Sequence, residues 1–363
     1  MMRSRPRPLH LRGTVLPDGD VRDVFVVDGR ITFTPAEDAR TVFDGGYLVP
    51  GLVDAHAHLS LFSPAGDAAS PPERVRASAR VQLDAGVLAV REPGSPDYAS
   101  QEISPAIGLP WTVTGGHLLA APGRYFPGLA REVDPDDLPA AAAEEVAASG
   151  AWCKVIVDFL APGGVITPTF PSDALAEAAR VVHAAGGKIT AHATCPEAID
   201  RVLVAGFDAI EHGTLMRPDQ VDTLAASGAA LVPTLMIGEG ILDAVRGFGG
   251  DDTAVEQMRR ALAAQGDVVR AAADRGVLVL AGTDAGMGPH GHVATEVAML
   301  LRVGLSPGTA LGAGSWDARR YLGLPGIEDG APADLVGYRD DPRQDVEELR
   351  RPAAILLNGQ QIR

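Results

Sequence analysis

The sequence predicts an α/β protein that consists of a (β/α)₈ TIM barrel and a small β-rich domain. Strand-like and helix-like segments alternate through the middle of the 363-residue chain, which is typical of a barrel of parallel strands. Both ends of the chain instead carry short β-prone runs and hairpin turns. Long segments follow the third, fourth and seventh predicted strands, where such a barrel carries its binding loops.

Apolar runs in the middle of the chain are the predicted barrel strands: 52–59, 87–91, 111–114, 154–158, 188–193, 209–212, 230–235 and 277–281. Helices are expected between most of them. Ser172 is expected to cap one helix, and Pro196 begins the next, which ends near Gly206. A doubly wound open sheet is the alternative, but no glycine-rich dinucleotide-binding fingerprint follows the first strand.

The two termini are expected to form one domain, because both are β-rich and the middle of the chain is not. Asp28-Gly29 and Asn358-Gly359 each separate two β-prone runs, as in tight hairpins. The predicted boundaries are 1–49 with 325–363 for the composite β domain and 50–324 for the barrel.

The amino-acid composition narrows the classes of binding partner and the compartment that we expect for this protein. The formal net charge of −16 argues against a nucleic acid or an anionic membrane as a partner. We expect a small-molecule substrate, and association with further copies of this chain stays open. The two cysteines, Cys153 and Cys195, match no structural zinc site and are expected to pack in the core, as in a reducing compartment. The basic stretch 1–8 does not resemble a signal peptide and no apolar run spans a bilayer, so we expect a cytoplasmic protein.

A pair of histidines is the most informative feature of the chain. His56 and His58 end the first predicted strand, and side chains two residues apart on a strand point to the same side. Further nitrogen and carboxylate donors lie at the ends of later strands. Because the carboxyl ends of all barrel strands meet at one face, these side chains are expected to surround one metal site, for which zinc is suited. The candidate ligands are His56, His58, Lys154, His192, His212 and Asp284.

An isolated histidine at a strand end is more often a hydrogen-bonded core residue than a ligand, and a lysine there often extends to solvent. Several such residues occur in order at the ends of successive predicted strands, and this combination favours a metal site over isolated core residues. The sequence resembles the amidohydrolase superfamily, and most closely its imidazolonepropionase-like and prolidase-like branch. The resemblance is carried by residues 50–58, His192, residues 211–214, residues 282–286, residues 330–336 and Asn358-Gly359.

This resemblance implies a distorted (β/α)₈ barrel with a β-sandwich built from both termini. It also implies two Zn²⁺ ions, or other divalent metals, in each chain. His56, His58 and Asp284 would bind the more buried metal, and His192 and His212 would bind the second. Lys154, carboxylated on its ε-nitrogen, would bridge the two, because two neighbouring cations need anionic oxygens between them.

The expected mechanism follows from the chemistry of such metals. They lower the pKa of bound water to about 7, so that a metal-bound hydroxide attacks a carbonyl carbon. Asp284 is the predicted catalytic residue, which takes the proton from the water and passes it to the leaving group. His117 and His290 are predicted to contact substrate because their segments resemble family segments. Tyr125, in the long loop after the third strand, is a third candidate.

The leading prediction is therefore a metal-dependent hydrolase that cleaves an amide C–N bond or a related carbonyl bond. An Xaa-Pro dipeptide or an N-acyl amino acid is the suggested substrate. The alternatives are a mononuclear imidazolonepropionase or deaminase-type enzyme acting on a cyclic amide, and a lactonase or esterase of the same superfamily. A non-catalytic scaffold is the remote alternative, since function depends on the site and not on the fold.

Overall fold

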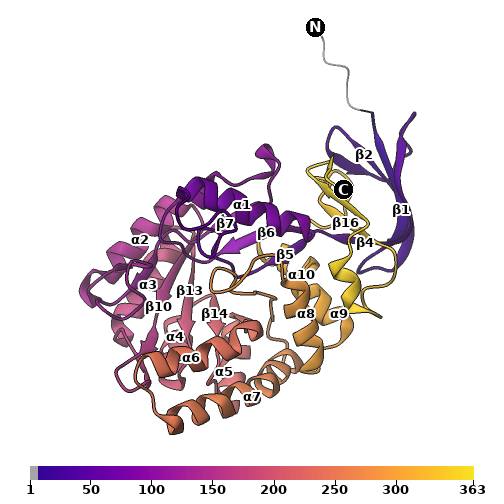
Figure 1. The fold of residues 1–363 in the computed structure, drawn as a ribbon. Helices are drawn as coiled ribbons and strands as arrows, with labels where there is room; N and C mark the ends of the chain where they lie inside the picture. The colour runs from indigo at the N-terminus through magenta and orange to yellow at the C-terminus, as the bar shows by residue number, and fades with distance from the viewer. Residues whose placement is uncertain (1–6) are drawn as a thin grey trace.

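The computed structural model describes residues 7–363 and shows an α/β protein, which confirms the predicted class. A large α/β part is joined to a smaller β part, in which strands from both termini lie together (Figure 1). The stretch 1–8, which we do not interpret as a signal peptide, lies outside the described residues except for its last two. No helix within the described range is long and apolar enough to cross a bilayer.

The smaller part is a seven-stranded sheet in the order β18-β17-β16-β4-β1-β2-β3. Asp28 and Gly29 turn with φ of 48° and 83°, and Asn358 and Gly359 turn with φ of 47° and 76°, so both predicted hairpins are confirmed. The sandwich form and the domain boundaries stay predictions. The strands are β1 (Leu9–Val15), β2 (Asp20–Val27), β3 (Arg30–Thr32), β4 (Arg40–Pro50), β16 (Leu335–Tyr338), β17 (Ala354–Leu357) and β18 (Gln360–Gln361).

Parallel strands form the centre of the larger part, in one sheet of three strands and one of six. The three-stranded sheet contains β5 (Leu52–Asp54), β6 (Val87–Glu92) and β7 (Trp111–Thr114). The other has the order β15-β14-β13-β10-β8-β9. Its strands are β8 (Leu118–Ala120), β9 (Ala130–Glu132), β10 (Trp152–Ile156), β13 (Lys188–Ala193), β14 (Ala209–His212) and β15 (Ala230–Val232). A hairpin of β11 (Asp158–Leu160) and β12 (Ile166–Pro168) follows β10.

The third predicted strand, 111–114, is observed as β7 with the same bounds, and a break at Gly115 and Gly116 separates it from β8. Before the break β7 pairs with β6, and after it β8 pairs with β10, so this segment links the two sheets. A side chain at Gly115 would put its Cβ 1.9 Å from the carbonyl oxygen of Pro93, which explains the glycine.

The eighth predicted strand, 277–281, forms only a bridge, between Val279 and Leu231 of β15. On its other side the amide of Ala55 donates to the carbonyl of Ala281 at 2.8 Å. This segment therefore lies between the first and seventh strands, as a barrel requires, but without a regular ladder. A continuous eight-stranded barrel stays a prediction.

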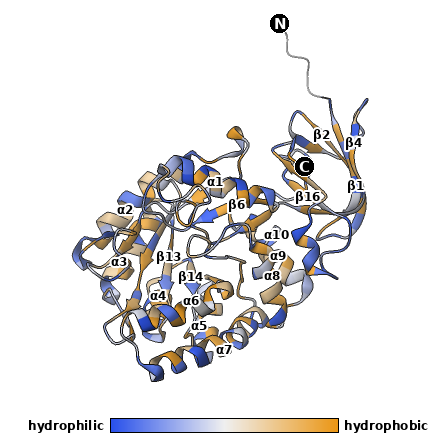
Figure 2. Cartoon of the chain, in the orientation of Figure 1, coloured by the Kyte–Doolittle hydropathy of each residue, from blue (hydrophilic) through white to orange (hydrophobic). Residues whose placement is uncertain are grey.

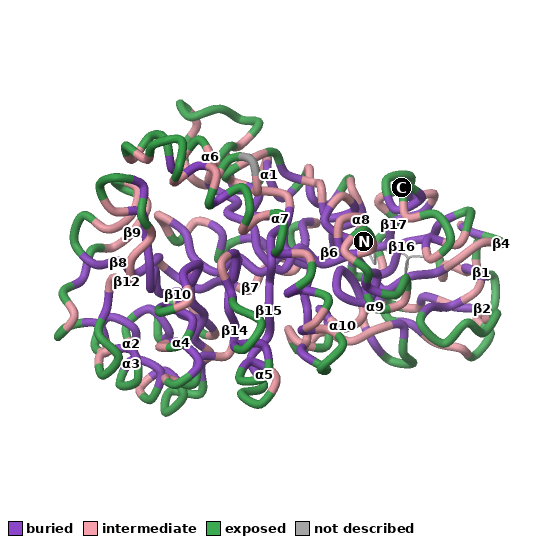
Figure 3. Tube along the Cα trace, turned by 90° about the horizontal axis from the view of Figure 1, so that it is seen from below, coloured by how far each residue is buried: buried purple, intermediate pink, exposed green. Residues whose placement is uncertain are grey.

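Helices lie around these sheets, and long ones such as α7 carry both hydropathy colours (Figure 2). The buried residues follow the central strands and the exposed ones follow the outer helices and loops (Figure 3). The helices are α1 (Pro71–Asp84), α2 (Leu138–Ser149), α3 (Ser172–Ala184), α4 (Pro196–Ala205), α5 (Pro218–Ser227), α6 (Gly238–Gly247), α7 (Asp252–Asp274), α8 (Val293–Arg302), α9 (Pro307–Ala313) and α10 (Trp316–Tyr321).

The predicted helix boundaries are close to those observed. Helix α4 begins at Pro196 and ends before Gly206, whose φ is 78°, as expected for a glycine after a helix. Ser172 is the first helical residue of α3 and not its cap, because Pro171 occupies the cap position with an extended backbone. The prediction of Ser172 as a cap was therefore wrong by one residue.

A buried carboxylate joins the terminal sheet to the larger part. Asp334 accepts from the indole of Trp111 at 2.7 Å and from the guanidinium of Arg319 at 3.3 Å, and its second oxygen accepts from the amide of Asn358 at 2.7 Å. The side chains of Arg319 and Asp334 are each 1% exposed. Removing one of the two charges would leave the other buried without its partner.

We predict that Asp334→Ala lowers the free energy of unfolding by about 3–5 kcal/mol, because Arg319 stays buried and unpaired. Chemical denaturation would measure this. Glu347→Ala is the matched control, since it breaks an exposed ion pair with Arg350 and should cost below about 1 kcal/mol. Equal losses in both variants would contradict the role given to Asp334.

Candidate metal centre

Three of the predicted ligands meet directly after the first and eighth strand segments. The Nε2 atom of His56 lies 3.3 Å from Nε2 of His58 and 3.3 Å from Oδ1 of Asp284. The Nε2 atom of His58 lies 3.4 Å from the same carboxylate oxygen. All three side chains are at most 7% exposed. Strand β5 ends at Asp54, earlier than predicted, but the two histidines still point to one side.

The protonation of these rings is set by their outer partners. Nδ1 of His56 lies 2.7 Å from a carboxylate oxygen of Glu211, and Nδ1 of His58 lies 2.5 Å from the carbonyl oxygen of Gly94. Both partners only accept, so each Nδ1 carries the proton in a neutral ring. Each Nε2 therefore presents a lone pair toward the other and toward the Asp284 carboxylate. Two imidazole nitrogens and a carboxylate oxygen placed in this way could hold a cation, and this donor set fits Zn²⁺.

Glu211 connects the site to four strands. It lies on β14 and accepts from His56 after β5, from Arg91 of β6 at 2.6 Å and from the hydroxyl of Thr190 on β13. Burial alone would raise the pKa of Glu211, but Arg91 and His56 outweigh it and hold the pKa well below its usual range. A carboxylate behind a histidine fixes the ring orientation and increases its basicity as a ligand.

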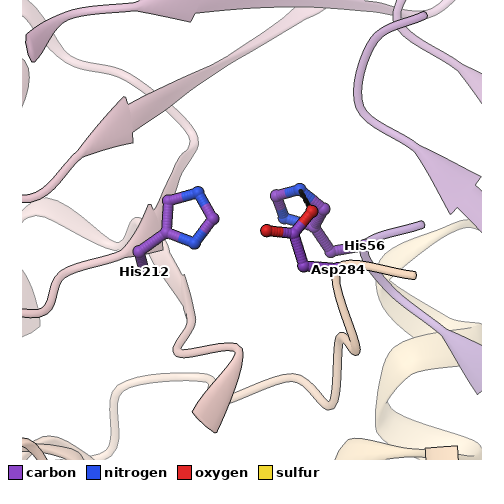
Figure 4. Close-up of side chains that lie close together, drawn as sticks. All are labelled: His56, His212 and Asp284. Carbon is purple, nitrogen blue, oxygen red and sulfur yellow. Dashed lines mark ion pairs between the residues drawn. The ribbon is translucent and has the colours of Figure 1, made fainter. Parts of the chain in front are cut away.

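His212 completes a group of three that could hold one metal. One ligand atom each from His56, His212 and Asp284 lies within 4.8 Å of the other two, and in Figure 4 the Asp284 carboxylate points toward the ring of His212. Thr234 holds Nδ1 of His212 at 2.8 Å. His212, Asp284 and Thr234 all have positive φ, of 72°, 54° and 46°. Such backbone strain at non-glycine residues is concentrated at functional sites.

His192 lies beside His212, with 4.5 Å between the ring centroids. Its Nε2 atom is 3.6 Å from Oδ1 of Asp158, a residue that the sequence analysis did not select. The other oxygen of Asp158 accepts the amides of Thr194 and Cys195, both at 2.6 Å. Asp158 thus positions the segment that follows His192. Its place at the end of a predicted strand was the available signal.

Burial keeps the imidazoles of His192 and His212 neutral. It lowers the pKa of His192 to about 3, helped by Lys154, and it lowers the pKa of His212 well below its usual range, helped by His192. Neutral rings are the form that binds metals. Burial also lowers the pKa of Lys154 to about 8, although Glu211 and Asp284 oppose the shift. A share of this amine is therefore uncharged near neutral pH.

All six predicted ligands line one cavity of about 420 Å³. Tyr125 also lines it, as predicted for a substrate contact. Neither His117 nor His290 is among the described residues that do so. The amide of His117 donates to Glu145 at 2.8 Å, and its ring packs against Tyr98. The Nε2 atom of His290 lies 3.0 Å from the carbonyl of Leu61, which supports the loop after β5.

Cys153 and Cys195 are both buried and free, and Cys153 faces the hydrophobic core on the side opposite Lys154. Neither cysteine lines the cavity, within the described residues.

Comparison with known proteins agrees with this geometry. The model of the amidohydrolase family matches residues 47–361. An uncharacterized protein of Mycobacterium tuberculosis is 41% identical over 98% of this chain and 96% of its own length.

Solved structures share the fold. One is an Xaa-Pro dipeptidase with methionine bound in its active site, with a TM-score of 0.82 and 20% identity over 98% of this chain and 99% of that one. Another is a prolidase in complex with N-methylphosphonate-L-proline, with a TM-score of 0.82 and 21% identity over 98% and 99% of the two chains. Together with the family match, they confirm the resemblance inferred from the sequence.

A buried acid next to the site provides a pH-dependent prediction. Glu92 accepts the amide of Leu59 at 2.6 Å through Oε1, while no described residue bonds Oε2. Burial raises the pKa of Glu92 to about 7 from 4.5. At pH values between 4.5 and about 7, the unfolded chain has released the Glu92 proton and the folded chain still holds it. The free energy of unfolding therefore decreases as the pH rises through this range.

We predict that the free energy of unfolding decreases by about 3 kcal/mol more in the wild type than in Glu92→Gln when the pH rises from 4 to 8. The glutamine keeps the bond to Leu59 and cannot ionise. Urea titrations with a chelator present, at several pH values, would measure the difference. Parallel curves for the two proteins would show that Glu92 does not titrate in this way.

Proposed function

We propose that this chain, which belongs to the amidohydrolase family, is a metal-dependent hydrolase of an amide C–N bond or a related carbonyl bond. One observation carries the proposal. Two imidazole nitrogens and a carboxylate oxygen lie 3.3–3.4 Å apart with their lone pairs directed at one another. That arrangement is stable around a cation and unfavourable without one.

The residues present fit a divalent metal such as zinc. His56, His58 and Asp284 would hold one ion, and His192 and His212 would hold a second. Divalent metals supply Lewis acidity, which polarises a carbonyl and makes water more acidic. Around them, Glu211 orients His56, Thr234 orients His212 and Asp158 orients the segment of His192.

Asp284 is the proposed proton acceptor. Its Oδ1 faces His56 and His58, and its side chain lines the cavity, so it can contact both metal and substrate. A general base must lie within hydrogen-bonding reach of the proton that it takes. The positive φ of Asp284 directs its carboxylate toward that position.

Lys154 is proposed to carry a carbamate that bridges the two ions. The reaction with carbon dioxide needs an uncharged amine, and burial provides this by lowering the pKa of Lys154 to about 8. The side chain is 2% exposed and lines the cavity together with the histidines. Without a carbamate, Lys154 would add a positive charge to a site that has to bind cations.

A one-metal enzyme that opens a cyclic amide is the second candidate. It is favoured by the tight group of His56, His212 and Asp284, which is sufficient for one ion. The number of metals separates the candidates. Elemental analysis of protein loaded with zinc and then desalted should find two equivalents for the binuclear hydrolase. One equivalent supports the second candidate, and none overturns both.

We predict that Lys154→Ala decreases the bound zinc from two equivalents to one or fewer and lowers kcat/KM at least tenfold, because the bridge is lost. Added acetate or propionate should restore part of both, since a small carboxylate can occupy the position of the carbamate. Zinc content and initial rates measured on the same samples would test this. An unchanged zinc content would contradict the bridging role.

We predict that Asp284→Asn retains the fold but loses at least about 100-fold in kcat, since a carboxamide cannot take up the proton. Circular dichroism and steady-state kinetics on zinc-loaded protein would measure both properties. Asp54→Asn is a suitable comparison, because Asp54 is buried nearby and bonds Thr283 and Gln82 without lining the cavity. Near-full activity of Asp284→Asn would exclude its role as the base.

A further inference from the structure

We propose that the cavity next to the metal ligands accepts an uncharged, apolar group, and that substrates with a free carboxylate at this position are rejected. This inference rests on the proposed function and narrows its substrate class. It disfavours the Xaa-Pro dipeptides and N-acyl amino acids suggested by the sequence, because both carry a free carboxylate.

One wall of the cavity is aromatic. Tyr125 and Phe126 come from the segment between β8 and β9, and Phe159 comes from β11. The three rings pack together, with centroid distances of 5.0 Å from Tyr125 to Phe159 and 5.1 Å from Phe126 to Phe159. Tyr125 also reaches toward His192, at 6.1 Å between centroids. The aromatic surface therefore begins directly beside a predicted ligand.

Another part of the wall is aliphatic. Met236, Ile237 and Ile241 line it from the start of α6 and the turn before it, and Met287, which is 51% exposed, lies on the segment after Asp284. A cavity of about 420 Å³ lies within the range of small-molecule sites. Apolar walls of this kind bind a substrate through the hydrophobic effect, without directional polar contacts.

Among the described residues that line this cavity, Lys154 is the only lysine or arginine. It lies among the metal ligands and would be neutralised or made anionic by carboxylation. Arg124 is next to Tyr125 in the chain, but its guanidinium donates to the carbonyl of Phe159 at 3.3 Å and to the hydroxyl of Thr167 at 2.7 Å. Its Nη2 atom is thus held by the β11–β12 hairpin, and Arg124 is not among the described residues that line the cavity.

Backbone amides do not replace the missing cation at the aliphatic wall. The amides of Leu235 and Met236 already donate to the buried carboxylate of Glu296, at 2.8 and 3.1 Å. A substrate carboxylate at this wall would lose its hydration and find no cation to pair with, which is unfavourable. An uncharged alkyl or aryl group would instead gain from burial.

A matched substrate pair tests the inference. N-benzoyl-leucine and N-(3-methylbutyl)benzamide share the same amide bond and alkyl group and differ only in the carboxylate. With zinc-loaded protein, kcat/KM for benzoate release should be at least tenfold higher for the uncharged amide. An equal or higher value for N-benzoyl-leucine would overturn the inference and leave the hydrolase proposal intact.

Substitutions at Phe126 test whether the aromatic wall causes the preference for the uncharged amide. Phe126→Arg adds a cation to the aromatic wall and should reduce the preference for the uncharged amide at least tenfold. Phe126→Leu, which keeps the wall apolar, and Val204→Arg, which adds the same charge at an 84% exposed position outside the cavity, should leave the preference unchanged. An unchanged preference in Phe126→Arg would overturn the role of the wall.

A binding measurement that needs no turnover distinguishes failure of the proposed function from failure of the inference about the cavity. If zinc-loaded protein releases benzoate from neither compound, the proposed function fails for these amides, and calorimetry on metal-free protein decides the inference. At least tenfold tighter binding of N-(3-methylbutyl)benzamide than of N-benzoyl-leucine would support it. Equal binding, or tighter binding of N-benzoyl-leucine, would overturn it.

Discussion

The buried carboxylate of Glu211 is the interaction on which the arrangement of the site depends. It bonds His56, Arg91 and Thr190, so that one side chain connects the ends of four strands that are far apart in sequence. The ion pair with Arg91, with both side chains fully buried, keeps Glu211 ionised. An ionised Glu211 in turn holds the proton on Nδ1 of His56 and leaves its Nε2 free to bind a metal.

More acidic than basic side chains are buried around the site, and this is the second physical constraint. The buried acids are Asp54, Glu92, Asp158, Glu211, Asp284 and Glu296, whereas Arg91 and Lys154 are the buried cations near them, within the described residues. Burial raises the pKa of Glu92 and Asp158 to about 7 and that of Glu296 to about 8. At neutral pH these three acids are therefore partly or largely protonated, whereas the pKa values of Glu211 and Asp284 are held well below their usual range, so these two carboxylates keep the negative charge that a divalent cation requires.

Chemistry and specificity come from different parts of the fold. The candidate ligands lie at or just after the ends of parallel strands, which backbone hydrogen bonds hold in register. The apolar cavity is instead formed by the long segments after β8, β10 and β15, together with the segment after Asp284. These segments have few constraints from the sheets, so their side chains can change without displacing the ligands. The same catalytic apparatus can therefore serve substrates of different polarity.

The sequence by itself determined the α/β class, both terminal hairpins and the six candidate ligands that line one cavity, because strand alternation, Asp-Gly and Asn-Gly turns and donors at strand ends are local patterns. Only the tertiary structure decided what surrounds these residues. Glu211 and His56 are 155 positions apart, and their contact depends on how the strands pack. His117 was predicted to contact substrate, but its amide bonds Glu145 of α2 and its ring turns away from the cavity, because side-chain direction at a glycine break follows from packing and not from a motif.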